Sequence, residues 1–99
     1  MTDALMEKVF MKNRDIVSRQ IAGETILVPV RGTVADMQRI FVLNPVGEYI
    51  WGCLDGQMTL LEIRDKVLAA FEVDAARAEA DVSDFITELV DAGLVKGAD

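Results

Sequence analysis

The sequence contains no histidine and only one cysteine, Cys53, and both shortages restrict its chemistry. A single cysteine cannot form an internal disulfide. Without histidine, the chain lacks the commonest metal ligand and the commonest general base. It also has no glycine-rich phosphate-binding loop and no cysteine pair for zinc. We therefore expect neither an enzyme nor a bound metal or cofactor, and we expect Cys53 to be a small buried apolar residue.

Basic residues are scarce as well: 10 lysines and arginines stand against 17 acidic residues, for a net charge of −7. The imbalance is local, because residues 72–91 hold seven acidic side chains and only Arg77 as a base. Such a surface disfavours nucleic acid as a partner. No run reaches the ~18 apolar residues of a membrane helix, and the acidic N-terminus differs from a signal peptide. We expect one cytoplasmic domain without membrane contact.

The first part of the chain predicts an arm followed by three short strands. Residues 1–14 are expected to form a frayed arm, with a docking segment as the alternative. Residues 16–21 and 25–30 flank a turn at Ala22-Gly23 and are typical of a hairpin. Pro29 cannot donate a hydrogen bond to a neighbouring strand, so it predicts an edge or a bulge. Residues 31–36 then form a loop before the third strand.

The third strand, residues 37–43, ends in four successive apolar residues, Ile40 to Leu43. A strand with one solvated face alternates between apolar and polar residues, so this run predicts cover on both faces. The helices can cover one face. Either the N-terminal arm, a second subunit or a ligand must cover the other.

Three helices follow, each with a clear start signal. Asn44 is a suitable N-cap before Pro45, and Gly56 is expected to end the first helix. Thr59 and Glu62 match a capping box for the second helix. The third is expected from about residue 75 to residue 92, with Asp74 as its cap.

Two features of these helices leave alternatives open. Trp51 lies away from the apolar stripe of the first helix, where it either packs against the sheet or the arm or contacts a partner enzyme. The third helix carries acidic residues on one stripe, at positions Asp81, Asp84, Glu88 and Asp91. This stripe is either a solvated face or an acidic rim that faces a basic partner.

Several sequence fragments resemble the PqqD family, named for coenzyme PQQ synthesis protein D. They are L-N-P-V-G-E-Y-I-W, then L-D-G followed by T-L-L-E-I, and finally A-D-V-S-D-F-I-T-E-L-V-D-A-G-L-V. The resemblance covers roughly residues 14–96. It implies an α+β, winged-helix-like fold in which a three-stranded antiparallel sheet packs on a three-helix bundle. The expected organisation is an arm at residues 1–14 and a PqqD-like domain at residues 15–96.

The resemblance also implies a function. Many members of this family are recognition elements that bind the leader of a ribosomally made precursor peptide. They present it to a modifying enzyme, often a radical-SAM enzyme, in the synthesis of PQQ or of another modified peptide. The leader adds a strand to the third strand and lies beside the third helix. The corresponding positions here are Met37, Arg39, Ile40, Phe41, Val42, Val82, Asp84, Phe85, Glu88 and Leu89.

Two other functions fit parts of the pattern. A winged-helix DNA-binding regulator would share the topology, although its recognition helix normally carries basic or amide side chains. A generic interaction module would pair its third strand with a second copy of itself. The sequence leaves open whether the protein is a monomer or a homodimer.

Overall fold

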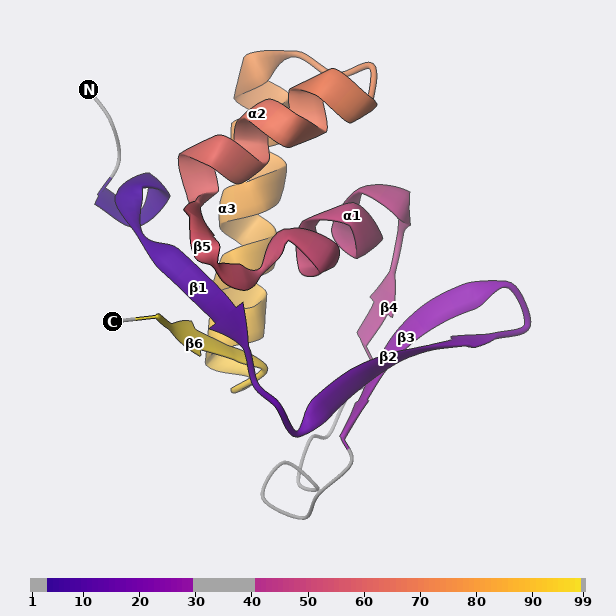
Figure 1. The fold of residues 1–99 in the computed structure, drawn as a ribbon. Helices are drawn as coiled ribbons and strands as arrows, with labels where there is room; N and C mark the ends of the chain where they lie inside the picture. Colours follow the sequence, from indigo (N-terminus) through magenta and orange to yellow (C-terminus); the bar gives the residue numbers. More distant parts are fainter. Residues whose placement is uncertain (1–3, 30–40, 99) are drawn as a thin grey trace.

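The computed structural model describes residues 4–29 and 41–98, which form three α-helices and two three-stranded antiparallel sheets (Figure 1). The fold is of the α+β class, as expected, with a second sheet in addition to the one that was predicted. The elements in chain order are a 3₁₀ helix η1 (Ala4–Glu7), β1 (Val9–Lys12), β2 (Ile16–Ile21), β3 (Glu24–Pro29), β4 (Phe41–Leu43), α1 (Pro45–Cys53), β5 (Asp55–Thr59), α2 (Leu60–Ala70), α3 (Ala75–Asp91) and β6 (Val95–Gly97).

The first sheet has the strand order β2-β3-β4 and contains the predicted hairpin. Its turn places Ala22 at a φ of 54° and Gly23 at a φ of 83°, the backbone that two-residue hairpins favour. The hairpin projects away from the helices (Figure 1). The described part of β4 begins at Phe41, so the predicted start of this strand at Met37 and the predicted loop at 31–36 lie outside the described residues.

The second sheet, β5-β1-β6, has the N-terminal segment as its central strand. The expectation of a frayed arm is therefore wrong for residues 4–12, and the docking alternative is confirmed. Met6 and Phe10 anchor this segment, with side chains 1% and 7% exposed. Strand β1 depends on partners from much later in the chain, and four residues carry too little periodicity to predict it. The folded unit thus begins before residue 15, the predicted boundary.

The local capping signals predicted the helix starts correctly. Asn44 accepts a hydrogen bond from a backbone N–H in the first turn of α1. Thr59 and Glu62 form the predicted capping box at α2. Asp74 caps α3 through its carboxylate. Because these interactions span only three residues, the sequence is enough to specify them.

The end of α1 differs from the prediction. The helix ends at Cys53, where the N–H of Leu54 donates to the carbonyl of Trp51 at 3.2 Å. Gly56 lies inside β5 instead, with a φ of 82°. A Cβ at this position would lie 3.5 Å from the Cβ of Met11 on the neighbouring strand. Gly56 therefore serves the irregular pairing of β5 with β1, which no local signal reveals.

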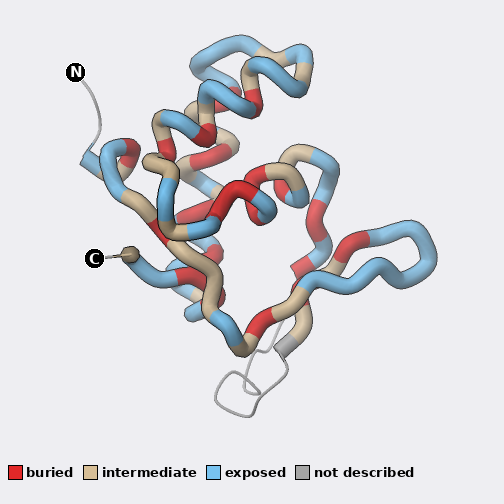
Figure 2. Tube along the Cα trace, in the orientation of Figure 1, coloured by how far each residue is buried: buried red, intermediate tan, exposed pale blue. Residues whose placement is uncertain are grey.

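One hydrophobic core joins the helices and both sheets, and its buried residues recur along the chain in Figure 2. Cys53 belongs to it, as predicted. Trp51 is 5% exposed, and the ammonium group of Lys12 lies 5.8 Å from its ring centroid. This confirms that Trp51 packs within the protein, next to the N-terminal strand. The largest fully buried side chains are Met6, Leu27, Ile50, Leu54, Leu60, Ile63, Val67, Val82, Ile86, Leu89 and Leu94.

Candidate functional site

Strand β4 exposes an apolar side chain at the end of its sheet. In the described part of the chain, the strand order β2-β3-β4 stops at β4. Phe41 and Leu43 point inward and are each 7% exposed, whereas Val42 is 54% exposed. The described residues leave Val42 without cover, and the described part of the predicted arm forms η1 and β1 instead. A second subunit or a ligand as the cover of this strand stays a prediction.

A small hollow of about 180 Å³ opens between β4 and α3. Its walls combine apolar side chains with one carboxylate, and the lining residues are Phe41, Val42, Leu43, Asn44, Gly47, Phe85 and Glu88. Gly47 matters because a Cβ there would lie 3.7 Å from both Cε1 and Cζ of the Phe85 ring. The Phe85 ring therefore lies directly against the backbone of α1, and it forms the floor of the hollow.

The structure divides the ten predicted site residues into three groups. Four of them line the hollow, namely Phe41, Val42, Phe85 and Glu88. Three others are on α3 but do not line it: Asp84 is exposed, and Val82 and Leu89 are fully buried. The remaining three, Met37, Arg39 and Ile40, lie outside the described residues.

Val82 and Leu89 were included because the resemblance places the leader beside the whole segment from Asp81 to Leu89, and the structure shows that part of this segment faces the core. Together with Ile86 they recur at helical spacing and face the core, with no exposed surface. Phe85 lies at the border of the stripe and is only partly buried. A residue at the border of an apolar stripe can contact both the core and an incoming partner. Phe85 therefore remains a candidate for direct contact with a peptide, whereas the fully buried Val82 and Leu89 do not.

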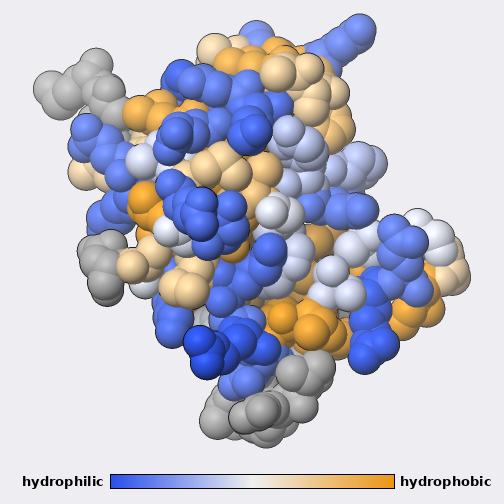
Figure 3. All heavy atoms as spheres, in the orientation of Figure 1, coloured by the Kyte–Doolittle hydropathy of each residue, from blue (hydrophilic) through white to orange (hydrophobic). Residues whose placement is uncertain are grey.

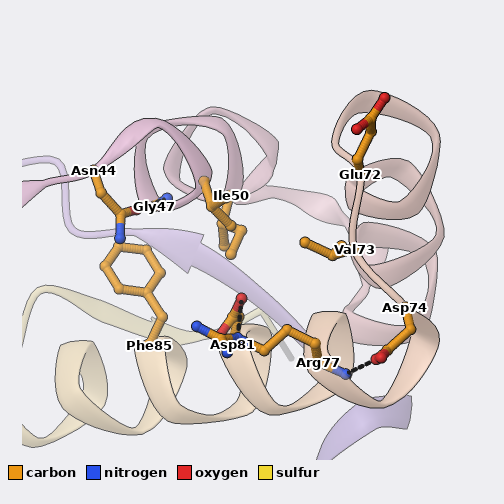
Figure 4. A pocket seen from close by; sticks show the side chains of 10 residues that line it. Asn44, Gly47, Ile50, Glu72, Val73, Asp74, Arg77, Asp81 and Phe85 are labelled. Carbon is orange, nitrogen blue, oxygen red and sulfur yellow. Dashed lines mark hydrogen bonds and ion pairs between the residues drawn. The ribbon is translucent and has the colours of Figure 1, made fainter.

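A larger hollow of about 670 Å³ adjoins the small one, and sequence reasoning missed it entirely. The two share Asn44, Gly47 and Phe85 in their linings. Figure 4 shows the larger hollow between α1 above and α3 below, closed on one side by the segment that contains Val73. Its position depends on three elements that are brought together only in the folded chain, so no single sequence motif marks it.

The charges around these hollows are unevenly paired. The Nε of Arg77 donates to Asp81 at 3.1 Å, which neutralises the first acidic residue of the α3 stripe. Among the described residues, the remaining stripe members Asp84, Glu88 and Asp91 have no ion pair. The part of the acidic stripe without an ion pair therefore begins after Asp81, and both interpretations, a solvated face and a rim facing a basic partner, now concern Asp84, Glu88 and Asp91.

The described residues show no metal-binding group, and their cysteine thiol is buried. They contain no group of three or more acidic, cysteine or histidine side chains placed to hold a metal ion. Burial raises the pKa of the Cys53 thiol above its ordinary value, which keeps the sulfur protonated and poorly nucleophilic. No described helix has the length and apolar character required to cross a membrane. The arrangement does offer a strand edge beside a hollow lined by both apolar and polar side chains.

Comparison with known proteins agrees with this geometry. The family model for coenzyme PQQ synthesis protein D (PqqD) matches residues 24–95. The chain belongs to the PqqD family. The match to the PqqD model spans β3, β4, α1, β5, α2 and α3, and so includes every described element that lines the two hollows.

A solved structure supports the same PqqD assignment. The chain is similar to the structure "TbiB1 in Complex with the TbiA(beta) Leader Peptide", with a TM-score of 0.68 and 28% sequence identity. The alignment covers 87% of this chain and 94% of that chain, so the two share nearly their whole fold. No curated protein sequence matches the chain.

Proposed function

We propose that this chain is a peptide recognition element of modified-peptide biosynthesis, and that it binds the leader of a ribosomally made precursor by strand addition to β4. The observation that carries the proposal is the exposed Val42 on the terminal strand of the first sheet, beside the hollow floored by Phe85. Membership of the PqqD family and similarity to a protein bound to a leader peptide support it.

Strand addition suits this surface for two physical reasons. A terminal strand offers backbone hydrogen bonds to any extended peptide, which provides affinity with little dependence on sequence. Alternate side chains of the added strand point to one face, where the hollow beside Phe85 can receive them. Burial of Val42 under the peptide would also remove an exposed apolar side chain from water, worth about 1.5–3 kcal/mol for complete burial.

The chain would act as a carrier and would leave the chemistry to a separate modifying enzyme, a radical-SAM enzyme or one of another class. In this role the chain fixes the leader in an extended form and thereby holds the precursor near that enzyme, which raises the effective concentration of the core peptide. The cytoplasmic location inferred from the sequence stays a prediction.

Affinity capture of the tagged chain from its native cells, followed by mass spectrometry of the protein and short-peptide fractions, would identify both partners. Binding of the recovered peptide would then be compared in Phe85→Asp and in Val90→Asp. Val90 is a suitable control because it is also an exposed apolar residue of α3 and lines neither hollow. Phe85→Asp should abolish binding, and Val90→Asp should bind like the wild type.

Because Phe85 is partly buried, Val42→Asp provides a second variant that should fold normally, since Val42 is 54% exposed. If both variants fold and still bind peptide normally, the peptide does not bind at β4 and the hollow beside it. Capture of DNA would instead favour the winged-helix regulator. A particle of twice the 10.9 kDa chain mass with no peptide would favour a homodimer joined through β4.

A further inference from the structure

The larger hollow continues the surface to which the peptide would bind. Strand β4 ends at Leu43, and the next residue, Asn44, lines both hollows. Gly47 and Phe85 are shared as well, and the Phe85 ring, which lies against the backbone of α1 at Gly47, forms the boundary between the two hollows. A peptide that extends along β4 and leaves at its C-terminal end therefore meets the larger hollow next.

The lining of the larger hollow combines apolar and charged side chains. Val46, Ile50, Val73 and Phe85 supply apolar side chains, of which Ile50 is 1% exposed. Three carboxylates, those of Glu72, Asp74 and Asp81, stand against the guanidinium of Arg77; Glu72 and Asp74 are exposed at the rim, whereas the pair of Asp81 and Arg77 lies between α1 and α3 (Figure 4).

Two of the three carboxylates are already engaged. Asp81 pairs with Arg77, and Asp74 accepts a hydrogen bond from the backbone N–H of Arg77 at 2.7 Å (Figure 4). Glu72 is exposed and has no hydrogen bond or ion pair among the described residues. Arg77, the one cation among the described residues of the lining, is therefore already paired, and an anionic ligand would meet uncompensated negative charge.

We propose that this hollow is a second subsite for the same peptide, which receives an apolar or aromatic side chain and a neighbouring lysine or arginine from the residues that flank the added strand. The inference rests on the proposed function. The apolar side chain would cover the Val46, Val73 and Phe85 surface, and the cation would lie at the rim beside Glu72. Aromatic and arginine side chains are those most enriched at binding hot spots.

The experiment starts with a displayed library of random peptides of about 15 residues, which span roughly 50 Å when extended. That length exceeds the 40 Å longest dimension of the protein. Peptides selected on the wild-type chain are sequenced, and their affinities are measured by fluorescence anisotropy for the wild type, Glu72→Lys and Glu7→Lys. Glu7 is the matched control because it undergoes the same substitution, is exposed in η1 and lines neither hollow.

The expected result is a set of peptides in which a strand-like segment is flanked by an apolar or aromatic residue and a basic residue. Glu72→Lys should weaken their binding roughly three- to tenfold, and Glu7→Lys should leave it unchanged. Replacing the basic peptide residue by glutamine should remove the difference between the wild type and Glu72→Lys. Higher salt should reduce that difference too, because the pair lies at an exposed rim.

Two outcomes would overturn the inference, and only the second of them would also overturn the proposed function. Selected peptides that require Phe85 and Val42 but show no flanking basic residue, and that bind Glu72→Lys normally, would exclude the second subsite and leave strand addition intact. Selected peptides that bind Phe85→Asp and Val42→Asp as tightly as the wild type would exclude the proposed function, and the second subsite with it.

Discussion

The two sheets have the same number of strands, but they differ in how far they bury their apolar side chains. In β5-β1-β6, distant segments of the chain meet, and the central strand buries Phe10 to 7% exposure. In β2-β3-β4, consecutive strands follow one another, and Ile21 and Val42 are each 54% exposed. Figure 3 shows apolar side chains gathered where the hairpin meets the rest of the protein. The first sheet thus offers surface for a partner, and the second closes the core.

The largest effect should come from weakening the closed sheet. Phe10→Ala should lower the free energy of unfolding by about 3–5 kcal/mol, because it removes a buried aromatic ring and leaves a cavity. Urea unfolding followed by circular dichroism would measure the loss. A loss below about 1 kcal/mol would mean that β1 contributes little to the core and that the N-terminal segment behaves as an arm after all.

An intermediate effect is expected at the junction between β4 and α1. Asn44→Ala removes the acceptor for the N–H of Gly47, a hydrogen bond of 2.7 Å, and should cost about 1 kcal/mol of stability. Asn44→Asp keeps an acceptor at this position and is the matched control. If both variants lose the same stability in urea unfolding, the capping interaction is not the cause.

A smaller effect is expected at the exposed strand. Val42→Thr keeps the β-branched shape and should change the free energy of unfolding by no more than about 0.5 kcal/mol, because the residue is largely exposed. Peptide binding should nevertheless weaken measurably, since a hydroxyl replaces a methyl group beneath the added strand. Unfolding in urea and peptide titration on the same sample would separate the two effects. A large loss of stability would contradict the view that β4 is optimised for a partner.

The smallest effect concerns the pH dependence of stability through Cys53. Burial raises the pKa of its thiol in the folded state above the ordinary value of 9.0, so the folded protein binds this proton more tightly than the unfolded chain does. The contribution is complete below the unfolded pKa and is lost as pH rises through the folded pKa. Between about pH 8 and about pH 10, the free energy of unfolding measured in urea should therefore decrease more for the wild type than for Cys53→Ala. An equal decrease for both proteins would contradict a raised pKa of the Cys53 thiol.

The sequence predicts the helices and the hairpin well because their determinants are local. Asn44, Thr59 and Asp74 act on backbone groups within one turn, and Ala22-Gly23 suffices to define a two-residue turn. The strands β1, β5 and β6 escape prediction for the opposite reason. Each is short, and each exists only through pairing with segments far away in the chain.

The candidate site was predicted in part. The apolar run ending at Leu43 predicted that β4 needs cover, and Phe85 and Glu88 line the hollow beside this strand. That these residues contact a peptide stays a prediction. The contact between Gly47 and Phe85 could not be predicted, because it depends on how closely α1 approaches α3. The same holds for the pairing of Arg77 with Asp81, which shortens the acidic rim to the later residues of α3.

The most direct test of strand addition is amide hydrogen exchange of the first sheet with and without bound peptide, because the sheet has two terminal strands and only β4 adjoins the hollow. Exchange would be followed residue by residue by NMR, with β2 as the internal control. We predict that peptide slows exchange in Phe41–Leu43 and leaves Ile16–Ile21 unchanged. Slower exchange in β2 alone, or in neither strand while the peptide is bound, would contradict the account.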